Sequence, residues 1–171
     1  RPLWHIANSA AIQNYPKAHL NMVRLGISMY GISGNSVEKT ALENVLSLKT
    51  YVSQIKNVAK GETVGYGRIG QFEEDGKIAT LAIGYADGYS RALGNGQGHF
   101  EINGHLCPTI GSICMDMTMI DVTGLDVHEG DEVFVFGPGY SIVEMAKDLE
   151  SIPYEVLTSV SQRVKRVYFH E

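Results

Sequence analysis

Apolar and polar residues alternate along much of the chain after residue 46, as in strands that bury one face. The first such stretch spans residues 48–55. Its two faces carry Leu48, Thr50, Val52 and Gln54 on one side and Tyr51, Ser53 and Ile55 on the other. Residues 117–122, 132–136 and 164–169 form further apolar segments. The pattern predicts a strand at each place, and the last strand is expected to close the domain.

Two dipeptides predict tight turns. Asp75-Gly76 lies between an extended stretch and residues 77–83, and Asn103-Gly104 separates residues 100–102 from residues 105–107. Both dipeptides favour the type I′ turn, in which two successive residues have a positive φ. We therefore expect a β-hairpin at each of them.

Within the strand-rich part of the chain, helix signals are confined to the region after residue 140. Ser141 and Glu144 have the spacing of a capping box ahead of residues 145–149, and Pro153 suits the first turn of another short helix. Because strands dominate the remainder, residues 43–171 are predicted to form a mainly β, barrel-like domain. This domain includes the only two helices expected in this part of the chain.

The first 42 residues have a different pattern. Apolar residues 3–7 are followed by Asn8-Ser9, both good N-cap residues, then by a short helical stretch and a second apolar run at residues 22–27. Strand, helix and strand in this order are typical of an α/β (TIM) barrel. Residues 1–42 are thus interpreted as a barrel remnant, with Gly34-Asn35-Ser36 as a linker. Residues 37–46 could be a short helix or an extended connection. Unpaired strands seek partners, so we expect this part to pack poorly alone, to dock on a neighbour or to be swapped between chains.

Composition excludes several classes of protein. The 171 residues carry a net charge of −5 without a basic stripe, so no nucleic-acid partner is expected. No apolar run could span a membrane. The chain opens without a start methionine or a signal-peptide pattern, so we expect it to begin inside a larger, cytoplasmic polypeptide. Cys107 and Cys114 fit no zinc pattern, so two half-buried cysteines in adjacent strands are expected, and no metal.

Two short segments carry candidate binding chemistry. Asn8-Ser9 and Gly26-Ile27 each lie just after an expected barrel strand. Loops at this end of α/β barrels often hold a phosphate through backbone N–H groups and short hydroxyls. Ordinary capping and turn chemistry explains the same residues and is the favoured of the two interpretations. Both interpretations remain open from the residues alone.

A set of motifs spans the whole chain and is more specific than any one of its parts. Its members are HIANS at residues 5–9, NMVRLGISMYG at 21–31, VGYG at 64–67, IGYADG at 83–88, ICMD at 113–116, IPYEV at 152–156 and RVKRV at 163–167. In this order they resemble the C-terminal part of the alanine racemase family, pyridoxal 5′-phosphate enzymes that interconvert L- and D-alanine. The resemblance extends to a Bacteroidetes-type fusion in which a cell-wall ligase precedes the racemase.

The resemblance implies a role for each matched residue. Tyr66 is similar to the tyrosine that exchanges the Cα proton on one face of the substrate, and Arg24 to the arginine facing the pyridine nitrogen. The positions similar to phosphate-binding residues are Asn8, Ser9, Gly26, Ile27 and Tyr154. Those similar to substrate-lining residues are Tyr85, Met115 and Asp116, with His5 and Arg166 in supporting positions. Tyr66 and Tyr85 are accordingly expected near each other at one rim of the barrel.

The resemblance also implies that an active enzyme needs residues that this chain does not contain. The family's second base is a lysine that holds the cofactor covalently near the start of the barrel, and Lys17, Lys39 and Lys49 have the wrong contexts. We therefore expect the chain alone to be inactive and to complete a site on the barrel of a second subunit in a homodimer. The implied function is supply of D-alanine for peptidoglycan synthesis. Alternatives are a non-catalytic dimerisation or binding module and a related pyridoxal-phosphate amino-acid racemase or decarboxylase.

Overall fold

The computed structural model describes residues 1–33 and 42–169 and divides the chain into two units, Arg1–Leu46 and Ser47–Glu171. The linker expected at Gly34-Asn35-Ser36 lies outside the described residues. So does much of the stretch at 37–46, of which residues 42–46 form neither helix nor strand. The two units are described separately.

The described part of the first unit contains short helices and no strand. The elements are α1 (Ser9–Asn14) and the 3₁₀ turns η1 (Pro16–Ala18) and η2 (Ile27–Tyr30). The predicted helix is confirmed as α1. At the N-terminus of α1, the Asn8 side chain accepts a hydrogen bond from the Ala11 N–H, as expected of an N-cap residue.

The strands predicted at residues 3–7 and 22–27 are wrong for this structure. Two backbone hydrogen bonds join the segments, from Asn21 N to Trp4 O (3.1 Å) and from Arg24 N to Ala7 O (2.9 Å). A strand needs a longer ladder of such bonds on at least one side. Most of the apolar side chains here are exposed, among them Leu3, Trp4, Ile6 and Leu25. The apolar pattern is thus present without a core to bury it.

The second unit is a mainly β barrel, as predicted. Its long strands are β1 (Leu48–Val58), β4 (Gly76–Leu81), β5 (His99–Ile102), β6 (His105–Pro108), β7 (Thr118–Asp121) and β8 (Glu132–Phe136). They form one antiparallel sheet in the order β6-β5-β8-β1-β4-β7. An antiparallel bridge between Thr109 and Ile120 brings the chain after β6 against β7, so the two edges of the sheet nearly close.

The interior of the barrel is filled by apolar side chains from all around the sheet. Phe100, Leu81, Ile120 and Val133 are completely buried. In β1 the predicted alternation holds for the buried Thr50 and Val52, and a register shift after Val52 then interrupts it. Bulges of this kind bend a strand and help a sheet to curve into a barrel.

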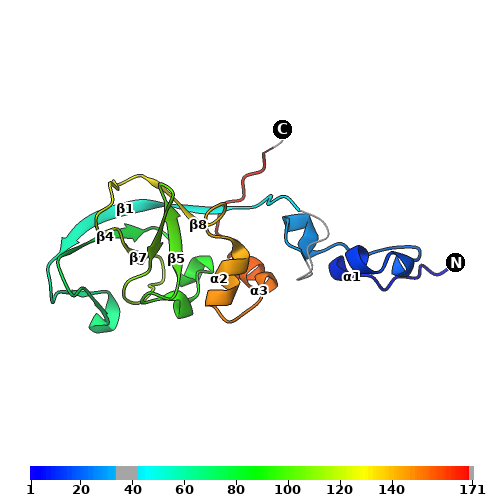
Figure 1. Ribbon diagram of the computed structural model, residues 1–171, viewed down its shortest axis with the longest axis horizontal. Helices are drawn as coiled ribbons and strands as arrows, with labels where there is room; N and C mark the ends of the chain where they lie inside the picture. The colour runs from blue at the N-terminus through cyan, green and yellow to red at the C-terminus, as the bar shows by residue number, and fades with distance from the viewer. Residues whose placement is uncertain (34–41, 170–171) are drawn as a thin grey trace. The chain divides into compact units, whose positions relative to one another are not determined.

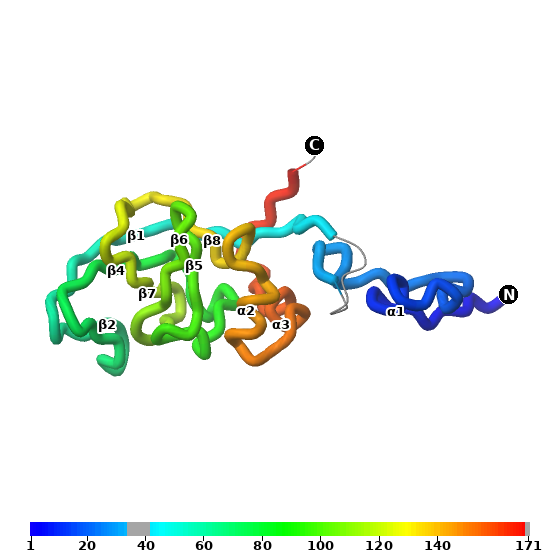
Figure 2. The backbone as a smooth tube through the Cα atoms, in the orientation of Figure 1, coloured from blue at the N-terminus to red at the C-terminus, as the bar shows by residue number. Residues whose placement is uncertain are grey.

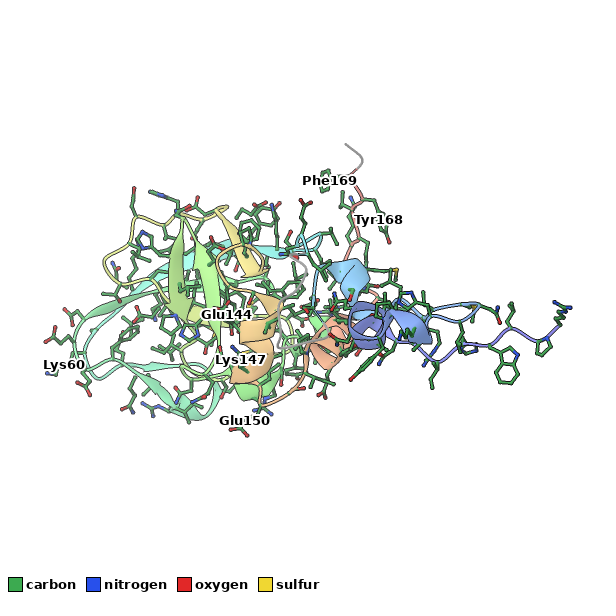
Figure 3. All side chains as sticks on the ribbon, turned by 45° about the vertical axis from the view of Figure 1, so that its right-hand side comes forward. Lys60, Glu144, Lys147, Glu150, Tyr168 and Phe169 are labelled. Atoms are coloured by element: carbon green, nitrogen blue, oxygen red, sulfur yellow. The ribbon has the colours of Figure 1, made fainter. Side chains whose placement is uncertain are left out.

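Two helices lie together at one end of this barrel (Figure 1). These are α2 (Ile142–Asp148) and α3 (Pro153–Ser159). The predicted capping box is confirmed, since Ser141 Oγ accepts from Glu144 N (3.2 Å) and Glu144 Oε2 accepts from Ser141 N (2.8 Å). Pro153 begins α3, as expected. Glu144 and Lys147 project from the outer face of α2 (Figure 3).

One of the two predicted hairpins is confirmed. Asn103 and Gly104 have φ values of 50° and 77°, and they join β5 to β6 with Ile102 opposite His105. Asp75-Gly76 does not form the expected hairpin, because β4 pairs with β1 and β7 instead. Gly76 is needed there for space, since a Cβ would lie 2.6 Å from the Phe72 ring.

The preceding stretch forms a separate small hairpin of β2 (Thr63–Val64) and β3 (Gly70–Gln71). Figure 2 shows the chain around β2 below the strands of the large sheet, at the margin of the unit. This small hairpin carries the 3₁₀ turn η3 (Tyr66–Arg68).

The closing strand predicted at residues 164–169 is also wrong. The Arg166 guanidinium donates to the carbonyls of Val160, Ser161 and Val164, which holds this segment in an irregular conformation. Tyr168 and Phe169 project into solvent (Figure 3). The two edges of the sheet approach each other at the bridge between Thr109 and Ile120, so the near-closure of the barrel does not use this segment.

Candidate functional site

Tyr66 lies at the tip of the small hairpin, between two glycines with left-handed backbone. Gly65 and Gly67 have φ values of 77° and 73°. A Cβ on Gly65 would come within 3.0 Å of the end of the Met119 side chain, which would have to shift, so the requirement for glycine comes mainly from the positive φ. Ser112 Oγ donates to the Tyr66 carbonyl at 3.1 Å. The backbone is therefore fixed while the Tyr66 side chain remains 76% exposed.

Tyr85 begins η4 (Tyr85–Asp87), which lies directly against the segment before β7. The N–H groups of Tyr85 and Ala86 donate to the carbonyls of Cys114 and Met115, each at 3.0 Å. A Cβ on Gly84 would lie only 2.3 Å from the Cys114 carbonyl oxygen. The glycine before Tyr85 thus allows two loops to meet.

These two loops and the Tyr66 turn surround a groove of about 490 Å³. Four residues proposed from the sequence line it: Tyr66, Tyr85, Met115 and Asp116. The expected proximity of Tyr66 and Tyr85 is confirmed. The groove is also lined by Arg91, Ser112, Ile113, Cys114 and Met117.

Sequence reasoning did not select these five additional residues. Ile113 and Cys114 lie within a quoted motif, and their neighbours Ser112 and Met117 could have been included by adjacency. Arg91 follows η4 in a polar stretch that carries no comparable signal. It is exposed and brings a permanent positive charge to the groove.

An arginine between two aspartates forms the main charge network beside the groove. Arg163 Nε lies 2.7 Å from Asp87 Oδ1, and Arg163 Nη2 lies 2.5 Å from Asp116 Oδ1. Partial burial would raise the pKa of the Asp87 carboxyl, but hydrogen bonds from Arg163 and the Gly84 N–H hold that pKa below its ordinary value. The hydrogen bonds to Asp87 and Asp116 in turn raise the pKa of Arg163.

Four of the five residues proposed to bind phosphate, Asn8, Ser9, Gly26 and Ile27, belong to the first unit. Ser9 is buried, and its Oγ accepts from the Gly26 N–H at 2.9 Å, while Asn8 caps α1. Gly26 precedes η2, which begins at Ile27. Asn8 therefore acts as a helix cap, as the capping interpretation expects. The hydrogen bond between Ser9 and Gly26 links the start of α1 to the turn before η2. Within the described part of the chain, the buried Ser28 Oγ has no hydrogen-bond partner.

The remaining proposed residues are not among the residues that line the groove. Arg24 is exposed and donates from Nη2 to the Ile6 carbonyl at 3.4 Å. Tyr154 is half exposed in α3, and its carbonyl accepts from Thr158 Oγ1. It is not among the described residues that line the groove. His5 is exposed in the first unit.

The two cysteines differ from the expectation of adjacent strands. Cys107 is buried in β6, whereas Cys114 is half-buried in the loop before β7, and both are free thiols. Burial, with a smaller contribution from Asp121, raises the pKa of Cys107 to about 11. Among residues 1–33 and 42–169, no group of three His, Cys, Asp or Glu side chains could hold a metal ion. No helix in that described portion is long and apolar enough to cross a membrane.

The barrel, its tyrosine-lined groove and the short first unit have counterparts in known proteins. Residues 45–168 match the family profile described as "Alanine racemase, C-terminal domain", and residues 1–34 match "Alanine racemase, N-terminal domain". The chain belongs to the alanine racemase family and corresponds to its C-terminal part.

Individual relatives agree with this assignment. The chain is 43% identical to an alanine racemase of Methanococcus maripaludis and 46% identical to one of Clostridium tetani, over 99% and 98% of its length. It is also similar to the crystal structure of an alanine racemase from Bartonella henselae with covalently bound pyridoxal phosphate. That match has a TM-score of 0.92 and 34% identity over 99% of this chain. The chain spans about half the length of these relatives, from 45% to 47%.

Proposed function

We propose that this chain supplies the C-terminal part of a pyridoxal 5′-phosphate-dependent alanine racemase, an isomerase that interconverts L- and D-alanine, with Tyr66 as one of its two bases. The observation that carries the proposal is the groove in which Tyr66, Tyr85, Met115 and Asp116 meet. Its support is the family assignment, which covers both units.

Tyr66 has the exposure that a base for an external substrate needs. Its side chain projects from a backbone that two glycines and Ser112 hold in place. A phenol has an ordinary pKa of about 10, so a tyrosine that acts as a base at neutral pH needs positive charge close by. Arg91 brings such a charge to the same groove. Tyr66 would take the Cα proton of one alanine enantiomer, and Tyr85, Met115 and Asp116 would shape the space for the substrate.

The first unit carries donors that suit the phosphate of the cofactor. Hydroxyls and backbone N–H groups are the common phosphate ligands at such turns. Ser9, Gly26 and Ile27 adjoin one another, and the unpartnered Ser28 hydroxyl lies in the same turn. These residues therefore fit the group, and Asn8 and Tyr154 would add to the set. When bound, pyridoxal phosphate supplies an electron-accepting ring that stabilises negative charge at the substrate Cα.

Arg24 would face the ring nitrogen of the cofactor. A guanidinium does not give up its proton at accessible pH. Arg24 would therefore leave that nitrogen unprotonated, which limits delocalisation of charge into the ring and favours proton exchange over transamination. Its side chain is exposed and makes one long hydrogen bond, so it is available for this contact.

The second base and the rest of the barrel would come from residues outside this chain. Lys49 already pairs with Glu132 at 2.7 Å and lies over the Phe134 ring, and Lys17 lies in the 3₁₀ turn η1. Lys39 lies outside the described residues. We propose that residues 1–42 complete a barrel and that the groove completes the site of a second subunit in a homodimer. Such an enzyme would act in the cytoplasm and supply D-alanine for peptidoglycan.

The test compares two proteins. One is this chain alone, and the other, called the joined protein here, carries the N-terminal part of the Clostridium tetani relative ahead of this chain. With pyridoxal phosphate and L-alanine, a coupled D-alanine assay should detect turnover by the joined protein and none by the chain alone. Borohydride should fix the cofactor only to the joined protein. A well-folded joined protein that binds the cofactor but does not racemise alanine would instead favour a non-catalytic module or a different substrate.

A further inference from the structure

Arg163 occupies an unusual position, because it bridges two loops that line the groove. One of its aspartate partners, Asp87, ends the 3₁₀ turn that begins with Tyr85. The other, Asp116, follows Met115 in the opposite loop and lines the groove itself. Arg163 does not line the groove. Its planar guanidinium can bond two carboxylates at once, which a lysine ammonium at the same place does less well.

Asp87 is fixed from several directions, so it is a rigid anchor for Arg163. Its Oδ2 accepts from the Gly84 N–H at 2.9 Å, and its carbonyl accepts from the Ser161 N–H at 2.9 Å. Its side chain is only 15% exposed. The turn that contains it is also bonded to Cys114 and Met115 through the backbone.

The segment that carries Arg163 is also anchored. Arg166 bonds three carbonyls of the chain between residues 160 and 164. Ser159 Oγ donates to the Gly88 carbonyl at 3.2 Å. Gly88 has a φ of 105°, and a Cβ there would lie 2.2 Å from the Ser159 carbonyl oxygen. The close approach of these two segments places the Arg163 side chain.

Asp116 differs from Asp87 because its carboxylate is half exposed and, among residues 1–33 and 42–169, its hydrogen-bond and ion-pair partner is Arg163. Without Arg163 this carboxylate would be free to turn, and it would place an unbalanced negative charge at the wall of the groove. An amino-acid substrate carries a carboxylate of its own, which such a charge would repel. With Arg163 in place the charge of Asp116 is compensated.

We propose that Arg163 is a positioning residue that fixes the Asp116 carboxylate and the Tyr85 loop, and so controls how readily the groove admits an amino acid. The kinetic consequence rests on the proposed function, whereas the structural consequence does not. Replacing Arg163 should weaken substrate binding more than it slows the chemical steps, since Arg163 does not line the groove.

The first part of the test uses the 171-residue chain. Methyl-labelled methionine gives an NMR signal for each of the six methionines, including Met115 beside Asp116. Arg163→Gln should shift or broaden the Met115 signal, and Arg163→Lys should do so less. The matched control is Lys49→Gln, which breaks an exposed ion pair of similar exposure in the sheet and should leave Met115 unchanged. A Met115 signal that is the same in Arg163→Gln and in the unaltered chain would overturn the positioning role.

The second part uses the joined protein. Arg163→Gln should raise the KM for alanine by about three- to tenfold while changing kcat less than about twofold, an effect of the size expected for one uncompensated charge near a polar surface. Added salt should reduce the difference by screening. Removing the charge of Asp116 in the same protein, as Arg163→Gln with Asp116→Asn, should return KM toward its original value.

The outcomes separate the two proposals. An equal loss of kcat in all Arg163 variants, without a salt effect and without recovery in the double variant, would contradict control of substrate admission. If the unaltered joined protein has no racemase activity, the proposed function fails, and the Met115 signal alone then decides whether Arg163 positions the groove.

Discussion

The two units of the chain solve the problem of burying apolar residues differently. The barrel of Ser47–Glu171 brings its sheet edges together and buries Phe100, Leu81 and Ile120 completely. The described part of Arg1–Leu46 has the sequence pattern of barrel strands, yet it forms no strand and exposes Leu3, Trp4 and Ile6. The difference teaches that an apolar pattern specifies a strand only where neighbouring strands are present to pair with it.

The largest expected effect is the loss of stability when a buried side chain of the barrel core is truncated. Phe100→Ala should lower the free energy of unfolding by about 3–5 kcal/mol, because the ring is fully buried and its removal leaves a cavity. The urea midpoint followed by far-UV circular dichroism measures this. The matched change in the first unit, Ile27→Ala, should leave that midpoint unchanged. Equal shifts for the two variants would show that the units share one core.

A smaller effect is expected at the turn that the sequence identified correctly. Gly104→Ala should cost about 1–2 kcal/mol, since a φ of 77° is strained for alanine and no atom within 4 Å obstructs the added methyl group. The cost would be backbone strain alone. A neutral Gly104→Ala in the same urea experiment would show that the turn relaxes freely and does not fix the pairing of β5 with β6.

The two Asx-Gly turns show how far local sequence reaches. Asn103-Gly104 makes the expected hairpin because the turn joins residues 100–102 directly to residues 105–107, and β5 pairs with β8 only along its other edge. At Asp75-Gly76 the long strand β1 competes for β4, and the Asp75 carboxylate instead accepts from the Lys60 N–H. Such long-range pairing is not encoded in the turn itself. The end of the chain is similar, since Arg166 takes the carbonyls of a segment whose apolar pattern predicts a strand.

The candidate site could be predicted only in part, because motifs identify residues locally and do not report contacts between distant segments. Motifs containing Tyr66, Tyr85, Met115 and Asp116 name residues that do meet in one groove. Arg91 lies outside every quoted motif, and Arg163 lies within the motif at residues 163–167 but is given no role there. Their contacts depend on how the segment after residue 88 and the end of the chain fold. Charged side chains at loop positions carry no periodic signal that reports such contacts.

A pH dependence should appear at the Asp87–Arg163 pair of the barrel unit. Hydrogen bonds hold the pKa of Asp87 below its ordinary value of 3.8, so the folded state favours the carboxylate. This contribution to stability is present above pH 4 and is lost as the pH falls through the lowered pKa. Arg163→Gln should therefore lower the urea midpoint near neutral pH and converge with the unaltered chain in acid. A difference between the two that stays constant from pH 7 to pH 2 would contradict this origin.

The smallest expected effect distinguishes the two thiols of the barrel unit. Cys107 is buried with a pKa of about 11, so at pH 8 its alkylation by iodoacetamide should need unfolding. Cys114 is half-buried at the groove and should react faster in the folded chain. Mass spectrometry of the two peptides gives both rates. Equal rates in the folded chain would mean that the barrel opens more readily than its closure suggests.

The central claim is that the groove presents Tyr66 as a base, and proton exchange tests it most directly. Tyr66→Phe in the joined protein removes one hydroxyl and keeps the ring, so the fold and cofactor binding should persist. In deuterated water, racemisation from L-alanine should fall by about 10²–10⁴-fold, the usual contribution of a positioned general base. Near-normal racemisation in both directions by Tyr66→Phe would contradict the role assigned to Tyr66.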